Sequence, residues 1–186
     1  MICIFTLTMP RKTYFKKQPV QKRILPCKLN RYKYFCLALL LSLTNISFAQ
    51  SKTFVKKFQP IADSLSVEYR IPTSVILGIS IIESGSGKSR NCKLLNNYFG
   101  IKGKNKLKKG IKSGYKQYPD AAASFADFCR VIKKKKFYKK LKGEENYKLW
   151  IDAISKSGYS EVPELWKKRV SDAIRKNKIY ITRQNN

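Results

Sequence analysis

The 186-residue sequence has no histidine, and its 11 Asp and Glu residues are few beside its 40 Lys and Arg residues. The absence of histidine excludes a Ser-His-Asp triad, a Cys-His dyad, a His-ligated zinc site and an imidazole proton shuttle. A general acid or base near neutral pH must therefore be a carboxyl group, Lys, Tyr or Cys. No oxygen-rich calcium loop and no complete nucleotide-binding fingerprint occurs, so we expect no metal site and no cofactor.

Long apolar runs are also scarce. The main one, FCLALLLSL at 35–43, follows the basic stretch KLNRYKY at 28–34 and leads to Ser47-Phe48-Ala49. A basic stretch, a short apolar core and small residues before a cleavage point are typical of a secretory signal peptide. The run is shorter than the roughly 20 apolar residues of a membrane-spanning helix, although an uncleaved N-terminal anchor is the alternative. We therefore interpret residues 1–49 as an N-terminal extension and signal peptide.

This interpretation predicts export to the periplasm, the cell envelope or the extracellular space, with no stable membrane insertion after cleavage. The formal charge of +29 predicts attraction to polyanions such as nucleic acid, anionic lipid or an anionic cell wall. Export argues against nucleic acid, and no helix-turn-helix, Arg-rich arm or RNP-like aromatic pattern is present. We therefore expect no specific nucleic-acid partner, and we expect the single remaining domain to be a monomer.

Three of the five cysteines fall within residues 1–49, which leaves Cys92 and Cys129. Two cysteines in an exported domain could form one disulfide. They could equally be two buried free thiols, and the sequence leaves both interpretations open.

The rest of the chain is divided into a basic lead-in at 50–57, one domain at 58–178 and a C-terminal tail at 179–186. The spacing of apolar residues predicts helices over 60–69, 75–82, 121–132, 147–154 and 163–174. The second of these is apolar nearly all round, as expected for a helix at the centre of a domain.

Residues 91–118 are rich in Asn, Gly, Lys and Tyr, which predicts irregular structure with a short hairpin near Ile101–Lys102 and Tyr115–Tyr118. Pro72 should end the helix before it, and Thr73 or Ser74 should cap the next one. The sequence therefore predicts a mainly helical α+β domain, with one loop-rich lobe inserted after the central helix.

Glu83 is the candidate catalytic residue. It follows the apolar run VILGISII and precedes Gly85, the expected C-cap of the central helix. Burial at a helix end penalises a carboxylate, and the negative end of the helix dipole penalises it further. Both effects raise the pKa of the carboxyl group, as a general acid near neutral pH requires. The alternative is a solvent-facing Glu in a last turn.

Four motifs follow one another in the chain. They are Glu83-Ser84-Gly85-Ser86-Gly87-Lys88-Ser89, Asn96-Asn97-Tyr98-Phe99-Gly100-Ile101-Lys102-Gly103, Tyr118 with the helix Ser124-Phe125-Ala126-Asp127-Phe128, and Gly158-Tyr159-Ser160. The second places amides beside aromatic faces, a mixture that suits sugars. The ordered set, over about residues 58–178, resembles the family 73 glucosaminidases found among flagellar muramidase-like wall hydrolases and bacterial autolysins.

The resemblance implies a lysozyme-like fold with a small loop/β lobe, and hydrolysis of the β-1,4 bond between N-acetylglucosamine and N-acetylmuramic acid in peptidoglycan. It implies that Glu83 is the catalytic acid and that Tyr159 is the active-site tyrosine. The implied substrate-binding residues are Asn96, Asn97, Phe99 and Tyr118. Ser86 stands where many family members have Trp.

A second carboxylate is not evident, because residues 101–119 contain no Asp or Glu. Glycosidases with two carboxylates hold them about 5–9.5 Å apart. Asp120 and Glu161 are the candidates, whereas we expect Asp127 to face solvent or to cap its helix. The substrate's own 2-acetamido oxygen is another candidate nucleophile, which we favour, with Tyr159 steadying it. A third hypothesis is a catalytically inactive peptidoglycan-binding module.

The basic surface is compatible with an anionic wall polymer. Lysines of the loop lobe should form a cationic rim that steers the enzyme to peptidoglycan carboxylates, and the charged run at 133–136 should extend it. The rim consists of Lys102, Lys104, Lys106, Lys108, Lys109, Lys112 and Lys116.

Overall fold

The computed structural model describes residues 29–108 and 111–181, with side chains for Tyr34 and for residues 50–108 and 111–180. The chain divides into two compact units, Met1–Leu40 and Leu41–Asn186, and the domain discussed below belongs to the second. Its elements, in chain order, are α1 (Leu29–Tyr69), α2 (Thr73–Ser84), α3 (Arg90–Leu95), α4 (Ala121–Lys133), α5 (Tyr138–Leu141), α6 (Tyr147–Ile154), η1 (Ser155–Tyr159), α7 (Pro163–Lys176) and η2 (Ile179–Ile181).

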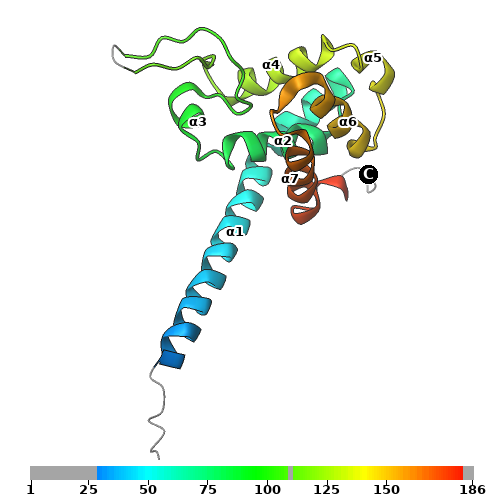
Figure 1. Cartoon of the computed structure of the whole chain (residues 1–186). Helices are drawn as coiled ribbons and strands as arrows, with labels where there is room; N and C mark the ends of the chain where they lie inside the picture. The colour runs from blue at the N-terminus through cyan, green and yellow to red at the C-terminus, as the bar shows by residue number, and fades with distance from the viewer. Residues whose placement is uncertain (1–28, 109–110, 182–186) are drawn as a thin grey trace, which may run out of the picture. The chain divides into compact units, whose positions relative to one another are not determined.

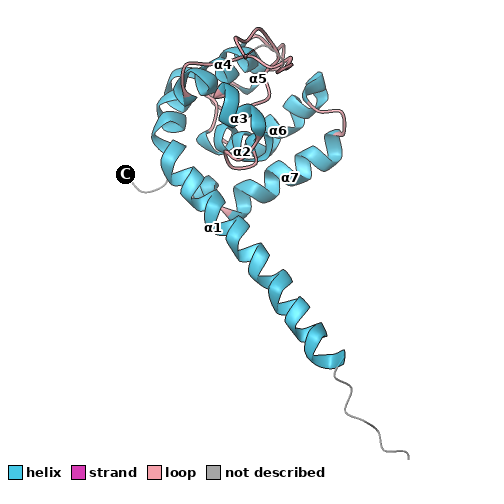
Figure 2. Ribbon diagram, turned by 90° about the vertical axis from the view of Figure 1, so that its left-hand side faces the viewer, coloured by secondary structure: helices cyan, strands magenta, loops and turns pink. Residues whose placement is uncertain are grey.

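The central helix is α2, as the apolar run predicted. Figures 1 and 2 show it surrounded by the other helices, and it packs most extensively on α7. Gly78 allows this close approach: a Cβ atom there would lie 2.5 Å from Cγ1 of Ile174. Gly85 ends the helix in the left-handed conformation (φ 56°), which confirms the predicted C-cap. The predicted N-cap is wrong, because Pro72 holds that position and the Thr73 hydroxyl donates to Asp63 instead.

The helix predicted over 60–69 is longer than expected, since α1 begins at Leu29 and contains Pro60. Phe54 and Phe58 are 5% and 4% exposed and belong to the hydrophobic core. The predicted lead-in at 50–57 continues α1 without a break, and its Phe54 joins Phe58 of the predicted domain in the core. The part of the predicted signal peptide at 1–28 lies outside the described residues. Of the helices described, none combines the length and apolar character of a membrane span.

The loop lobe joins α3 to α4. Lys102 and Tyr115 form an isolated antiparallel bridge, which is where the sequence predicted a short hairpin. Tyr118 N–H donates to the Leu95 carbonyl over 2.8 Å, so the lobe returns to the end of α3. The short helix α3 was not predicted; Ser89 caps it through a bond from Cys92 N–H. The result is a mainly helical domain with a lobe that is almost free of strand.

The C-terminal half follows the predicted pattern with two additions. Helices α4, α6 and α7 have nearly the predicted bounds, whereas the four-residue helix α5 was not foreseen. The C-terminal tail was expected to start at 179, but Ile179 is buried and η2 packs on α2. Packing on α2 therefore continues into the first residues of the predicted tail.

Cys92 and Cys129 are both free and both buried, so the structure contradicts the disulfide alternative. The two thiols occupy different environments. Cys92 contacts the hydroxyl groups of Tyr98 and Ser84, while Cys129 on α4 has no exposed surface within the core. Burial is the main reason that their pKa values rise, to about 11 for Cys92 and about 12 for Cys129.

Candidate active site

Glu83 lies in the last turn of α2 and is half-buried. Its Oε1 accepts a hydrogen bond of 2.7 Å from the indole Nε1 of Trp166, near the start of α7. Burial raises the pKa of the Glu83 carboxyl, and the indole bond, which favours the charged form, offsets only part of the rise. The structure therefore agrees with the desolvated helix-end acid that the sequence predicted.

The second oxygen of Glu83 faces the loop lobe. A Cβ atom built on Gly100 would lie 3.7 Å from Oε2 of Glu83 and 3.9 Å from Cε1 of Tyr115. Gly100 has φ +65°, a backbone conformation that favours glycine, and a Cβ atom there would be in ordinary van der Waals contact with the carboxyl group. The missing side chain keeps Oε2 free of a covering methyl group.

Tyr159 approaches the same carboxyl group from η1. Its hydroxyl donates to the Phe99 carbonyl over 3.0 Å, and its ring centroid lies 5.5 Å from that of Trp166. Burial, followed by the negative charge of Glu83, raises the pKa of Tyr159 well above its ordinary value. The predicted pair of Glu83 and Tyr159 is therefore brought together, with Trp166 as a partner that the sequence analysis missed.

Asn97 does not offer its side chain to a ligand, in contrast to the substrate-binding role predicted for it. It is 1% exposed. Its Nδ2 donates to the carbonyls of Ile101 and Lys116, and its Oδ1 accepts from the backbone N–H groups of Phe99 and Ile101. All four bonding positions of the amide are thus used to fold the lobe. Asn97 shapes the segment that places Gly100 beside Glu83.

Asn96 also has a structural role. It ends α3 in the left-handed conformation (φ 52°), and its Nδ2 donates to the carbonyls of Tyr118 and Pro119. Both amide protons are engaged at the return of the lobe, so direct binding of substrate by the Asn96 amide N–H groups is excluded in this arrangement.

Phe99 and Tyr118, both predicted to bind substrate, are likewise buried, at 2% and 5% exposure, although an edge of Tyr118 reaches a surface hollow described below. Phe99 stacks on Phe128 with ring centroids 4.2 Å apart. The Tyr118 hydroxyl donates to Asp127 over 2.8 Å. The aromatic residues of these motifs stabilise the wall of the site from behind.

Asp127 was expected to face solvent or to cap its helix, and both interpretations are wrong. Its carboxylate is 13% exposed and accepts bonds from Lys116, Tyr118 and Arg130. Burial alone would raise the pKa of Asp127, but these three donors outweigh it and lower the pKa. Asp127 is therefore an anchor between α4 and the loop lobe.

The two candidates for a second carboxylate are both exposed. Asp120 caps α4 by accepting from Ala123 N–H, and Glu161 lies in the exposed segment before α7. Burial raises the pKa of Glu83 and the Trp166 bond lowers it in part, and no other acid contributes to the shift. Among residues 29–108 and 111–181, no three Cys or acidic residues gather as a metal site would require.

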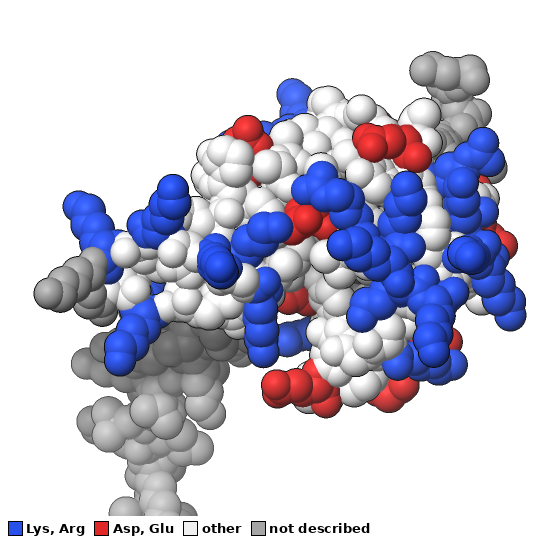
Figure 3. Space-filling model, turned by 90° about the horizontal axis from the view of Figure 1, so that it is seen from above, with Lys and Arg blue, Asp and Glu red and all other residues white. Residues whose placement is uncertain are grey.

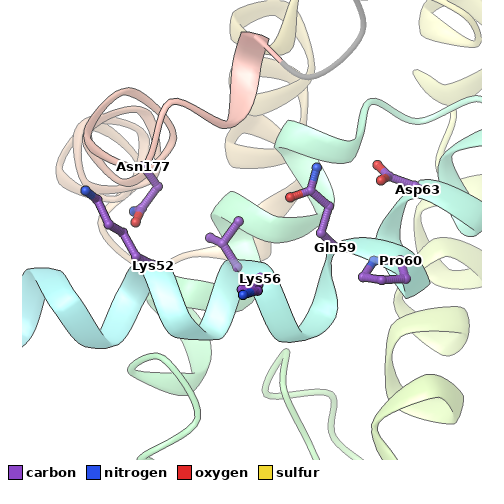
Figure 4. Close-up of a pocket in the computed structure, with 7 residues that line it drawn as sticks. Lys52, Lys56, Gln59, Pro60, Asp63 and Asn177 are labelled. Carbon is purple, nitrogen blue, oxygen red and sulfur yellow. The ribbon is translucent and has the colours of Figure 1, made fainter. Parts of the chain in front are cut away.

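Two surface hollows flank the domain. One, of about 440 Å³, is lined by Tyr118 and lobe residues that include Lys104 and Lys106. The other, of about 420 Å³, lies along α1 near the end of α7, where Lys52 and Asn177 face each other in Figure 4. The linings of these two hollows do not include Glu83.

Comparison with known proteins agrees with this geometry. The family model for glucosaminidases, described as mannosyl-glycoprotein endo-beta-N-acetylglucosaminidase, matches residues 59–179. No curated protein matches the sequence.

Three solved structures share the fold. The catalytic domain of the autolysin Auto from Listeria monocytogenes has a TM-score of 0.60 at 21% identity, over 71% of this chain and 86% of that chain. An N-acetylmuramoyl-L-alanine amidase from Staphylococcus aureus has a TM-score of 0.62 at 24% identity, over 74% of this chain and 44% of that chain. A truncated glycoside hydrolase domain of FlgJ from Salmonella typhimurium has a TM-score of 0.56 at 19% identity, over 69% of this chain and 97% of that chain. The chain belongs to the glucosaminidase family, glycoside hydrolase family 73, and is a glycoside hydrolase with a lysozyme-like fold.

Proposed function

We propose that this protein is an exported peptidoglycan hydrolase that cleaves the β-1,4 bond between N-acetylglucosamine and N-acetylmuramic acid, with Glu83 as the general acid. The observation that carries the proposal is the Glu83 carboxyl group. Burial raises its pKa, Trp166 holds one of its oxygens, and the other oxygen faces a glycine. A carboxyl group with a raised pKa and one oxygen already engaged can hold a proton on its other oxygen and donate it from there.

The direction of proton delivery follows from the Trp166 bond. An indole N–H can only donate, so Oε1 of Glu83 must act as an acceptor. The acidic proton is therefore carried by Oε2, the oxygen beside Gly100. In the reaction, this proton passes to the glycosidic oxygen as its bond to the anomeric carbon breaks.

The nucleophile in this proposal is the substrate's 2-acetamido oxygen. Asp120 and Glu161 are exposed and Asp127 is held by three donors, so none is offered as a partner for Glu83. The acetamido oxygen would form a bond to the anomeric carbon while the leaving sugar takes the proton. Water then opens the resulting ring with Glu83 as base, which returns the proton to Glu83 and retains the anomeric configuration.

Tyr159 would assist this step by accepting a hydrogen bond. Its own proton is directed to the Phe99 carbonyl, so its oxygen keeps acceptor capacity. Accepting from the acetamido N–H would orient that group and increase electron density on its oxygen. The Phe99 contact thus gives Tyr159 a defined orientation for positioning the substrate.

Charge and export complete the proposal. The lobe exposes Lys102, Lys104, Lys106, Lys108 and Lys112, which would attract the carboxylates of peptidoglycan. Lys116 is excluded from this rim because it is paired with Asp127 over 2.7 Å. The basic and apolar pattern at 28–49 supports export to the periplasm or cell envelope.

The test is digestion of purified peptidoglycan, with mass spectrometry to identify the sugar at each new reducing end. The wild-type protein should release N-acetylglucosamine reducing ends with retained configuration, and Glu83→Gln should release none while keeping its circular dichroism spectrum. The matched control is Asp120→Asn combined with Glu161→Gln, which should stay active. Inversion of configuration, or loss of activity in the control, would refute substrate assistance. Peptidoglycan binding by a wild-type protein that releases no reducing ends would identify a binding module instead.

A further inference from the structure

A group of lysines follows α4 and is separate from the loop lobe. We define the lysine patch as Lys134, Lys135, Lys136, Lys139, Lys140 and Lys142. All but Lys135 are exposed. The ion pairs in the described part of the domain involve other basic residues, namely Lys116, Arg130, Lys156, Lys167 and Arg175 with their acids. The sequence has no Asp or Glu between Asp127 and Glu144, so positive charge dominates the patch.

The patch has a rigid support. The Tyr138 side chain is buried, and its hydroxyl donates to the Tyr69 carbonyl over 2.7 Å. Its ring lies 6.2 Å from that of Trp150, and Gly143 N–H donates to the Arg70 carbonyl over 3.1 Å. These contacts fix α5 to the end of α1, so the lysine backbone positions are ordered before any ligand arrives. Binding therefore costs side-chain entropy but little backbone entropy.

From the sequence, the charged run at 133–136 was expected to extend the cationic rim of the lobe, but the structure separates the two. The lobe is tied to the N-terminal half of α4 through Ser124 and Asp127, whereas Lys134 is the C-cap of that helix. Glu83 lies ten residues after Thr73 on α2, which spans about 15 Å at the helical rise of about 1.5 Å per residue. Arg70, which holds the patch, precedes Thr73. The patch and the carboxyl therefore lie toward opposite ends of α2.

The chemistry of the patch favours a flexible polymer with spaced negative charges. Its charges are all lysines, which are mobile point charges, in contrast to the planar fork with which arginine recognises a fixed phosphate. None of the large exposed apolar residues of the described chain falls within residues 134–142, so the segment that carries the patch offers no such side chain for insertion into a bilayer. In Figure 3, viewed from above, Lys and Arg side chains crowd the right-hand side as well as the lobe at the left.

We propose that the lysine patch is a second polymer-binding surface, which holds carboxylates of the peptidoglycan stem peptides at a distance from the bond being cleaved. The proposal rests on the proposed function for its substrate. It adds that binding of whole wall material and turnover of short fragments depend on different residues. The lysine patch should therefore control retention on the wall and leave the chemistry at Glu83 unchanged.

The experiment compares two variants that lose equal charge. The patch variant replaces Lys134, Lys136, Lys139 and Lys140 by Gln. The control variant replaces four dispersed exposed lysines by Gln, namely Lys93, Lys148, Lys168 and Lys176. Each protein is mixed briefly with purified sacculi in the cold, and the bound fraction is measured after pelleting. A second sample of sacculi has its carboxyl groups converted to neutral amides. Release of reducing ends from short soluble glycan fragments is measured separately.

The patch variant should bind sacculi about tenfold more weakly than wild type at low salt, and the difference should vanish at about 1 M salt, where the screening length is about 3 Å. The control variant should stay within about twofold of wild type, and all three should cleave short fragments equally. Equal loss in both variants, no loss in the patch variant, or undiminished binding to neutralised sacculi would overturn the proposal. Binding of each protein to anionic phospholipid vesicles is measured in parallel. If the patch variant lost binding to the vesicles but not to sacculi, the proposal would also be overturned. If wild type cleaves no fragment, the proposed function fails, whereas the pelleting result still tests the patch.

Discussion

Replacing Gly78 by alanine should disturb the acid through the packing of two helices. The added Cβ atom would lie 2.5 Å from Cγ1 and 2.8 Å from Cδ1 of Ile174, which is fully buried. Ordinary contact begins at 3.4 Å, so about 0.9 Å must be gained, and because Ile174 is enclosed by the core we expect much of it to come from separation of α2 and α7. If that displacement reaches the start of α7, the 2.7 Å bond from Trp166 to Glu83 exceeds hydrogen-bonding distance.

The loss of folding free energy in Gly78→Ala can be estimated from three contributions. Overpacking costs about 1–3 kcal/mol, the higher helix propensity of alanine returns about 1 kcal/mol, and loss of the indole bond costs about 1 kcal/mol. The net destabilisation is therefore about 1–3 kcal/mol. Displacement of a catalytic group by about 1 Å can reduce turnover about 100-fold, so we expect activity to fall by about 10- to 100-fold.

Urea unfolding measures the stability, and release of reducing ends from peptidoglycan measures the activity. The matched control is Gly114→Ala, because a Cβ atom there meets nothing within 4 Å. The control should match wild type in both assays. A Gly78→Ala protein with wild-type stability and turnover would refute the idea that this glycine sets the separation of α2 and α7.

Three further predictions concern single side chains. Trp166→Phe removes the donor that favours ionised Glu83, so the pKa of Glu83 should rise and the alkaline limb of the pH–activity profile should move to higher pH; a shift to lower pH would contradict the assignment. Asp127→Asn should lower the free energy of unfolding by about 1–3 kcal/mol at pH 7. Because the pKa of Asp127 is lowered from 3.8, this difference should be fully present above about pH 4 and shrink as the pH falls further; a difference that grows in acid would refute the anchor. Cys92 and Cys129 are free, so a reductant should leave the melting temperature unchanged, and a fall would indicate a disulfide.

The sequence predicted those helices whose apolar residues recur at helical spacing within the helix itself. Helix α4 was placed to within one residue, because its apolar residues recur at helical spacing around a well-packed face. Helix α3 was not predicted, because its six residues are too few to show a helical spacing of apolar positions. The only local signal for it is Ser89, which caps its N-terminus. The continuity of residues 50–57 with α1 had a local signal as well, because Phe54 and Phe58 are four residues apart and both lie on its buried face.

The candidate site was predictable only in part. The buried position of Glu83 followed from its own helix, but Trp166 is 83 residues away and no local pattern links the two. Asn97 and Tyr118 were expected to bind substrate because the family resemblance implies it, and for Asn97 also because amides beside aromatic faces suit sugars. The hydrogen-bond partners of these side chains depend on how the lobe folds back on itself and on α4. That is tertiary structure, which a local sequence pattern does not specify.

The bond between Trp166 and Glu83 also gives the enzyme a built-in optical reporter. The sequence has two tryptophans; Trp150 is fully buried, with its indole N–H donating to the Glu144 carbonyl. Its emission should stay constant, whereas the emission of Trp166 should respond to the charge state of the carboxyl group that it touches. A Trp150→Phe protein would then report, by fluorescence alone and without any labelled substrate, when the acid holds its proton and when a glycan occupies the space beside it.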